Sequence, residues 1–499
     1  MRPLPTAEKA LVWILSLHLC FLAWAFGSTR PLAQQISLGL AVIGFVVALW
    51  RRPPTPADNP VPGSQAVENS PPHRIDAPSN PAWARLWRFP PFWLGLALLG
   101  YIAIQAFNPS FSYRSFRQFR WLVAVDSVSW LPSGIDVPFA RFNTWSQFII
   151  DASTWLVICS AWIGLTRRRS LVALVLVLVV NAVALAAIGF IERLTHADKI
   201  LWLWIPPDAT PFSTFVYKNH AGAYLALMTF VAAGLALWIM DRGERKLQKS
   251  TPAPLLALAA VFVGASVFFS LSRGATLTLT ATAIAFVVWL FHRRRRTKAT
   301  GTSWRATLVV AAVLGAFVLN TARYLDYDRV AEGFDRLHQE GWSEVSLRGR
   351  LLLHAAAFDM LRDHGLRGVG AGGFRHLFSA YTRKYPEIYA DGQIYWNHAH
   401  DDWLEIPIDL GLTGSLLLLA VAIWYSVHFI RQRVWWHPIA FPIVLSCTQT
   451  LVHAWYDFPF QCPAILIAWC TLLTIAARWV MIQESGPRSL SFKMDHVAP

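Results

Sequence analysis

A dense run of polar side chains lies at residues 397–405, with the sequence Asn-His-Ala-His-Asp-Asp-Trp-Leu-Glu. Histidine titrates near neutral pH, so His400 could accept the proton of a hydroxyl group while a neighbouring carboxylate orients its ring. His398 and His400 together with Asp401 and Asp402 could instead bind a metal ion. Such adjacent ligands rarely reach one ion without a further contributor, and the chain has no other His or Glu motif with familiar zinc spacing. The run therefore predicts either a general base or a metal site.

Basic side chains lie at the predicted ends of two apolar segments. Arg273 stands in a Ser-Arg-Gly triplet between two apolar runs, and Lys218 and Asn219 begin another apolar run after a loop. An arginine beside the bilayer is costly unless it is paired or faces a cavity, and its planar guanidinium suits phosphate. A cation and an amide at a helix N-terminus also suit an anion. The alternatives are a snorkelling interfacial arginine and an ordinary helix cap.

Two further pairs of polar residues fall on the same predicted side of the membrane. Arg348 and Arg350 open a predicted helix over residues 346–364, and His453 and Asp457 lie between the last two apolar segments. The arginines could simply be solvated, and His453 and Asp457 could simply cap a tight turn. Taken together, these residues predict an outward-facing cavity with cations for a phosphate group and a histidine for proton transfer.

The glycine-rich run at residues 368–373 matches the G-x-G-x-x-G pattern of dinucleotide-binding folds. That fingerprint requires a strand before it and a helix after it, whereas a helix is predicted before this run. The pattern therefore does not indicate a nucleotide site. It indicates a corner between helices where two backbones approach closely.

The composition is that of a membrane protein: 55% of the 499 residues are hydrophobic, 25 are tryptophan, and the mean hydropathy is +0.40. Repeated apolar runs of about 20 residues predict transmembrane helices, and their continuous character excludes a closed β-barrel. The predicted fold class is an all-α polytopic membrane protein with about 12 transmembrane helices. They are expected near residues 11–27, 33–50, 91–107, 144–165, 170–191, 217–240, 254–271, 274–291, 306–321, 406–429, 437–455 and 461–480.

Short loops rich in arginine and lysine mark the cytoplasmic side, which places both termini inside and the long polar segment 322–405 outside. In that segment, apolar residues at helical spacing predict the helix over 346–364 and a second, short helix near 374–381. Residues 108–143 form a shorter outer loop. The predicted units are a transmembrane hairpin (1–50), a flexible cytoplasmic linker (51–90), a transmembrane core (91–321), a large helical periplasmic loop (322–405), C-terminal transmembrane helices (406–480) and a cytoplasmic tail (481–499).

The formal net charge of +15 does not indicate nucleic acid as a partner, because no recognised binding motif is present. Most of this charge orients helices and faces anionic membrane lipid. All five cysteines lie in predicted spans, so neither a disulfide framework nor a thiolate metal site is expected.

The order of these motifs resembles that of the O-antigen ligase and polymerase superfamily, bacterial inner-membrane glycosyltransferases that use polyprenyl-diphosphate-linked glycans. The resemblance covers about residues 212–463, roughly half of the chain. It departs from the family at Asp401, where Asn is usual, and at Lys218, where Arg is common. The elements that match the family are the segment 215–222, the triplet 272–274, the Arg350 helix leading to Gly368, the run 399–405, the segment 411–414, and His453, Asp457, Phe458, Pro463 and Ala464.

The resemblance implies a fold of the multispanning GT-C class and catalysis without a metal ion or another cofactor. The donor would be a glycan on undecaprenyl diphosphate, and His400 would accept the proton of the acceptor hydroxyl group, with inversion at the anomeric carbon. Arg273 and Arg350 would hold the diphosphate, and Lys218 and Asn219 would assist at the leaving group. Arg348, His453 and Asp457 would complete the substrate-binding set.

The identity of the acceptor stays open at this stage. A ligase would move the glycan to the lipid A–core, a polymerase would join lipid-linked repeat units of O-antigen or exopolysaccharide, and a third branch glycosylates protein hydroxyl groups. The expected partners are thus the lipid-linked donor, one of these acceptors and membrane lipids. A different class, a twelve-span anion permease, would place its charged residues near the middle of the bilayer, whereas here they lie at its outer face.

Overall fold

The computed structural model describes residues 4–50, 82–117, 119–139, 141–197, 199–205, 210–297, 345–389 and 396–482. The expected span at 306–321, most of the linker and the C-terminal tail lie outside the described residues. The side chains of residues 296–297, 345–348 and 350 are outside them too.

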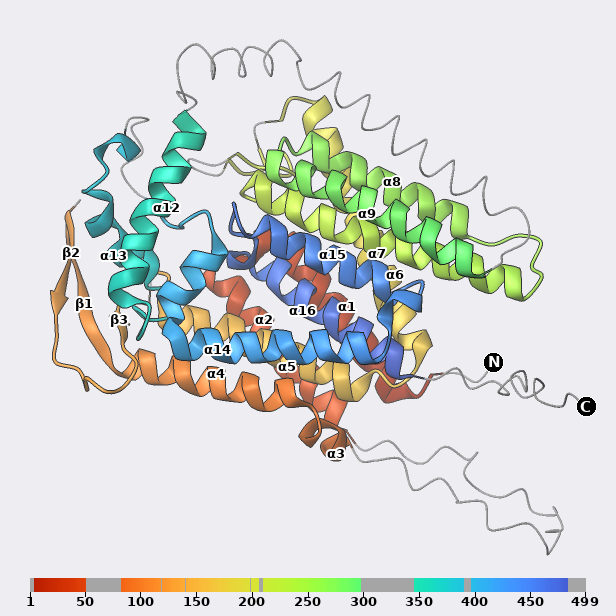
Figure 1. Cartoon of the computed structure of the whole chain (residues 1–499), viewed down its shortest axis with the longest axis horizontal. Helices are drawn as coiled ribbons and strands as arrows, with labels where there is room; N and C mark the ends of the chain where they lie inside the picture. Colours follow the sequence, from red (N-terminus) through yellow and green to blue (C-terminus); the bar gives the residue numbers. More distant parts are fainter. Residues whose placement is uncertain are drawn as a thin grey trace, which may run out of the picture.

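Long helices make up most of the described chain (Figure 1). Among the described residues, nine helices are long and apolar enough to cross a membrane, and α8 and α15 are shorter apolar helices. Each expected span other than 306–321 overlaps one of them, which confirms an all-α polytopic membrane protein. The apolar helices are α1 (Thr6–Trp24), α2 (Pro31–Leu49), α4 (Pro90–Phe107), α5 (Thr144–Gly164), α6 (Arg168–Leu194), α7 (Lys218–Arg245), α8 (Ala253–Phe269), α9 (Arg273–Thr297), α14 (Asp402–Arg431), α15 (Ala440–His453) and α16 (Pro463–Met481). A short helix, α3 (Ala82–Trp87), precedes α4 within the range expected to be a linker.

Helix α7 lies at the centre of the bundle and packs against α6, α8, α9, α15 and α16. Its side chains are buried almost all round, as at Tyr224, Leu227 and Val231, which are fully buried. A helix that is apolar on every side is expected in such an interior position. Because α7 begins at Lys218, its N-terminus is held at the end of the bundle where the loops bearing the candidate residues meet.

The outer loop at 108–143 contains a small sheet that the sequence analysis did not predict. Strand β1 (Pro109–Phe116) pairs antiparallel with β2 (Phe119–Ala124) and parallel with β3 (Gly134–Asp136). Phe111 and Tyr113 alternate with polar neighbours in β1, which is the pattern of a half-buried strand. Tyr113 packs with Leu377 of the neighbouring helix α13, so the sheet joins this loop to the polar segment.

The described part of the polar segment 322–405 folds as a helical subdomain. Helix α12 (Val345–His364) and helix α13 (Phe374–Thr382) correspond to the two helices expected there. Their apolar faces form a cluster with residues of α14 and of the chain leading into it. The cluster includes Leu353, Met360, Phe374, Phe378, Ala399 and Ile408.

The glycine-rich run forms the close backbone corner that the sequence predicts. Gly368 and Gly370 have φ angles of +76° and +97°, and a Cβ atom on Gly370 would lie 2.4 Å from Cα of Gly134. The corner packs against a kink in α14 at Gly411, where φ is +64°. A Cβ atom on Gly411 would lie 2.5 Å from the carbonyl carbon of Arg367, so only glycine fits at this contact.

Polar groups of α14 next to its kink accept hydrogen bonds from neighbouring elements. The Tyr101 hydroxyl of α4 donates to the Leu410 carbonyl at 2.6 Å, and the Val369 amide donates to the Ile408 carbonyl at 2.9 Å. The Asp409 carboxylate accepts from the amides of Gly372 and Phe374, both at 2.8 Å. These bonds fix the first turns of α14, and with them the position of the preceding His400 loop.

Candidate active site

Asp457 contacts residues from three separate parts of the chain. It lies in the turn between α15 and α16 and is 3% exposed. The side-chain amide of Asn219 donates to Asp457 Oδ2 at 2.6 Å. His453 Nε2 lies 3.7 Å from Oδ2, and His400 Nδ1 lies 3.8 Å from Oδ1. The structure therefore brings three of the predicted site residues around a fourth, the buried carboxylate of Asp457.

The electrostatics of this group favour an ionised Asp457. Burial alone would raise the pKa of this carboxyl group. The neighbouring histidines His453, His400 and His220 act in the opposite direction and hold the pKa below its ordinary value. Asp457 is thus a carboxylate at neutral pH, placed to stabilise positive charge on an adjacent imidazole.

Phe458 supplies the ring contacts that order the same group. Its ring stacks on Tyr217 and on His398, with centroid distances of 5.3 and 4.4 Å. His220 and His400 meet it edge-on at 5.0 and 4.7 Å. The phenyl ring therefore restricts the imidazole of His400 on one side while Asp457 attracts it on the other.

The backbone around His400 is held in an uncommon conformation. His400 has a φ of +54°, in the left-handed region that favours glycine and asparagine. Asp401 caps α14 by accepting from the amides of Trp403 and Leu404 at 2.8 and 3.3 Å. His354 of α12 donates through Nε2 to the His400 carbonyl at 3.4 Å. Such strain persists only where surrounding contacts enforce it, and it is frequent at functional sites.

Asp402 ties this loop to the turn that carries Asp457. Its carboxylate accepts from the Phe460 amide at 2.9 Å, and its own amide donates to the Ala454 carbonyl at 2.9 Å. Asp402 is therefore a structural link between the start of α14 and the turn between α15 and α16.

His398 has both ring nitrogens engaged. Its Nδ1 lies 2.8 Å from Glu405 Oε1, and its Nε2 lies 3.4 Å from a guanidinium nitrogen of Arg375. A guanidinium only donates, so Nε2 accepts and Nδ1 donates to Glu405. Burial lowers the pKa of His398 well below its usual range, the Arg375 charge adds to this effect, and Asp457 opposes it. His398 thus has a positioning role, and of the two loop histidines His400 is the candidate base.

These contacts bear on the alternative of a metal site in this loop. Asp401 and Asp402 are used as a helix cap and as a link between loops, and His398 is bound to Glu405 and Arg375. Within the ranges that the structure describes, no three His, Cys, Asp or Glu side chains gather as metal ligands would. The loop is built as a hydrogen-bonded support for His400.

Of the predicted cations, Arg273 and Lys218 are each next in sequence to a residue that contacts this group. Arg273 begins α9 and is exposed. The next residue, Gly274, lies so close to His453 that a Cβ atom on it would be 2.9 Å from Nε2 of that ring. Lys218 is half-buried at the start of α7, next to Asn219. Arg348 and Arg350 belong to the first turns of α12, and their side chains lie outside the described residues.

Several contact residues were not predicted as part of the site. Tyr217, His354, Arg375, Glu405 and Phe458 orient the histidines through stacking and hydrogen bonds. Tyr217 and Phe458 lie more than 200 positions apart, and no local pattern indicates that their rings stack. Glu405 and Phe458 belong to the elements that carry the family resemblance, which is the one sequence signal for them.

Part of the chain is similar to a known protein family. Residues 258–420 match the family model described as O-antigen ligase. Residues 258–420 are thus similar to an O-antigen ligase domain. The match confirms the predicted superfamily of O-antigen ligases and polymerases, whose members are glycosyltransferase-like enzymes. The matched range includes Arg273, α12 and His400, whereas Lys218, His453 and Asp457 lie outside it. No curated protein matches the chain.

Proposed function

We propose that this protein transfers a glycan from undecaprenyl diphosphate to an acceptor hydroxyl group of the lipid A–core, at the periplasmic face of the bacterial inner membrane. The observation that supports this most directly is the meeting of His400, Asn219 and His453 around Asp457 at one end of the bundle. An imidazole oriented by a buried carboxylate is an arrangement suited to general-base catalysis. The similarity to an O-antigen ligase domain supplies the class of reaction.

In the proposed reaction, the acceptor oxygen attacks the anomeric carbon as the carbon–oxygen bond to the diphosphate breaks. The proton of the hydroxyl group passes to His400, and the lipid diphosphate leaves with the electron pair of the broken bond. Attack from the side opposite the diphosphate inverts the anomeric carbon. Asp457, 3.8 Å from His400, stabilises the imidazolium that forms.

The leaving diphosphate needs cationic partners. We assign this role to Arg273, Lys218 and Arg350, whose charges would stabilise the negative charge that develops as the bond breaks. Arg348, next to Arg350 in the same helical turn, adds charge at this point. These cations supply the stabilisation that a metal ion provides in other phosphate chemistry.

The expected role of Asn219 changes with the geometry. Its amide nitrogen already donates to Asp457 at 2.6 Å and to the Tyr217 hydroxyl at 2.7 Å, so both of its hydrogens are used. We therefore propose that Asn219 positions Asp457 instead of contacting the leaving group. Asp457 is a buried carboxylate and would repel a diphosphate. We therefore propose that Asp457 and the adjacent His453 act on His400 and do not bind the diphosphate.

The function can be tested with purified protein in lipid vesicles that contain a glycan linked to undecaprenyl diphosphate. Three acceptors are offered separately: lipid A–core, a second lipid-linked repeat unit and a peptide with hydroxyl side chains. We expect the glycan on lipid A–core, with release of the lipid diphosphate. Transfer to the lipid-linked unit alone would show a polymerase, and transfer to the peptide alone a protein glycosylase. Anion uptake without any transfer would show a permease and overturn the proposal.

A further inference from the structure

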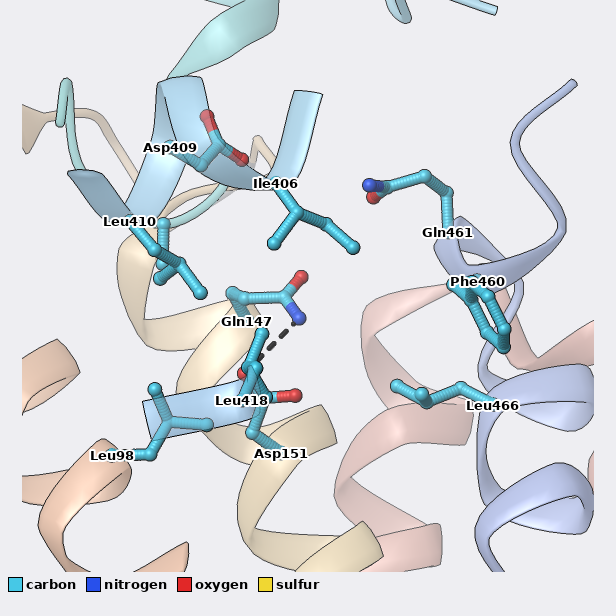
Figure 2. A pocket seen from close by; sticks show the side chains of 11 residues that line it. Leu98, Gln147, Asp151, Ile406, Asp409, Leu410, Leu418, Phe460, Gln461 and Leu466 are labelled. Atoms are coloured by element: carbon cyan, nitrogen blue, oxygen red, sulfur yellow. Dashed lines mark hydrogen bonds between the residues drawn. The ribbon is translucent and has the colours of Figure 1, made fainter. Parts of the chain in front are cut away.

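A cavity of about 100 Å³ lies beside the candidate active site, between α4, α5, α14 and the turn that begins α16 (Figure 2). It shares a wall with the site, because Phe460 and Gln461 line it and follow Asp457 in the same turn. The Phe460 amide and the Gln461 side chain both donate to Asp402, at 2.9 and 3.4 Å. The cavity is therefore fixed relative to the His400 loop.

The polar groups of this cavity are carboxylates and carboxamides. Asp151, Gln147 and Asp409 line it together with Gln461, and no Lys, Arg or His is among its described lining residues. Gln147 reaches into the middle of the pocket, and its amide donates to Asp151 Oδ2 at 3.2 Å (Figure 2). The other oxygen of Asp151 accepts no hydrogen bond from the residues that the structure describes. A carboxyl group within a transmembrane helix, with one neutral partner and no cation, marks a functional site.

The remaining wall of the cavity is apolar and includes Leu98, Leu418, Leu466 and the Phe460 ring. A sugar ring has an apolar face that packs on such side chains, and hydroxyl groups that donate to carboxylates and carboxamides. We propose that this cavity binds one sugar unit of the transferred or accepting glycan, an uncharged or amino sugar and not an acidic one. The assignment rests on the proposed function.

The size and charge of the cavity set the class of ligand. A volume of about 100 Å³ exceeds what a few water molecules need and is somewhat below the ~150 Å³ of a cavity that holds a benzene ring. A pyranose with its hydroxyl groups is larger than benzene, so the cavity takes up part of one sugar ring and cannot hold two. Since no Lys, Arg or His is among the described lining residues, the carboxylate of a uronic acid would be desolvated here without an ion-pair partner, which is costly.

The binding experiment uses the full-length protein in detergent and needs no transfer reaction. The probes are the methyl glycosides of glucose, galactose and mannose, together with their 2-amino and uronic acid analogues, and the readout is the thermal unfolding midpoint. We expect at least one neutral or amino glycoside to raise Tm by about 2–4 °C at saturation, and the matching uronide to leave it unchanged. Asp151→Asn keeps the shape but replaces one carboxyl oxygen by an amide nitrogen, which cannot accept a hydrogen bond, so the Tm shift caused by the neutral or amino glycoside should become smaller. Leu98→Phe narrows the cavity and should abolish every shift.

The proposal is overturned if no neutral or amino glycoside raises Tm, or if the shifts are the same in the wild type, Asp151→Asn and Leu98→Phe.

A separate transfer assay identifies whether the cavity binds the donor glycan or the acceptor glycan. Asp151→Asn should raise KM about tenfold for the donor or for the acceptor, with kcat unchanged. A fall in kcat with both KM values unchanged would show a merely structural role. A wild-type protein that binds sugar but transfers none would refute the proposed function and leave this binding site standing.

Discussion

At the residue scale, Asp457 organises the candidate active site. It accepts a hydrogen bond from Asn219 and lies within 4 Å of ring nitrogens of His400 and His453. Its lowered pKa keeps it ionised, so it can orient an imidazole and stabilise the imidazolium formed on proton transfer.

Removing the negative charge of Asp457 while keeping the shape of its side chain tests whether it stabilises the imidazolium of His400. We expect Asp457→Asn to lower kcat for glycan transfer about 100-fold or more, because the amide no longer stabilises an imidazolium. KM for the donor should change little. Single-turnover transfer in vesicles measures both quantities, and an unchanged kcat would show that Asp457 is only structural.

The lowered pKa of Asp457 also predicts how this variant depends on pH. A carboxyl group whose folded pKa is depressed stabilises the fold above its unfolded pKa of 3.8, and this contribution is lost as the pH falls toward the folded pKa. Wild type should therefore exceed Asp457→Asn in Tm near pH 6, and the difference should shrink as the pH is lowered to 3. A difference that stays constant over this range would contradict an ionised Asp457.

Asp401 gives a second prediction at this scale. It caps α14 immediately after His400, and Asn caps a helix as well as Asp does. Asp401→Asn should keep wild-type stability and transfer, whereas Asp401→Ala should lose about 1 kcal/mol and part of the activity. Thermal unfolding midpoints and transfer rates of the two variants test this prediction. Equal values for both variants would show that the Asp401 cap does not position the His400 loop.

At the scale of elements, the kink of α14 against the glycine-rich corner positions the His400 loop. Gly411→Ala should destabilise the protein by about 3 kcal/mol or more, because the new Cβ meets backbone atoms and φ is +64°. Gly100→Ala is the matched control on the adjoining helix α4, since nothing lies within 4 Å of its new Cβ. Thermal unfolding should show a large loss only for Gly411→Ala. A comparable loss in both would mean that the corner is not a rigid support.

The sequence predicts most elements but only part of the site. The apolar runs predict the spans because a helix must satisfy its backbone internally within lipid, and the glycines 368–373 indicate the close corner. The sheet at 109–136 was missed, since its alternation is short and carries exposed aromatic side chains. Contacts such as His398 with Arg375, and Asn219 with Asp457, join segments distant in sequence, so only the fold reveals which residues act and which position them.

At the scale of the whole molecule, the candidate residues gather at one end of a bundle, and the proposal places that end outside the cytoplasm. Ser379 of α13 and Gln432 after α14 are both exposed, and they lie on opposite sides in this topology. In spheroplasts, a membrane-impermeant maleimide should label Ser379→Cys at once, and Gln432→Cys only after permeabilisation. The native cysteines lie within helices or are buried, so the wild type serves as the unlabelled control. The reverse pattern would place the site in the cytoplasm.

The most direct test of glycan transfer with His400 as the base is the transfer rate of His400→Asn in vesicles. Asparagine tolerates the left-handed conformation at this position but cannot act as a base, so the fold is kept while the chemistry is removed. His292→Asn, at an exposed position on α9, is the matched control. We expect a loss of about 100-fold or more in the transfer rate of His400→Asn and a wild-type rate for His292→Asn. A folded His400→Asn protein that transfers glycan at the wild-type rate would contradict this expectation.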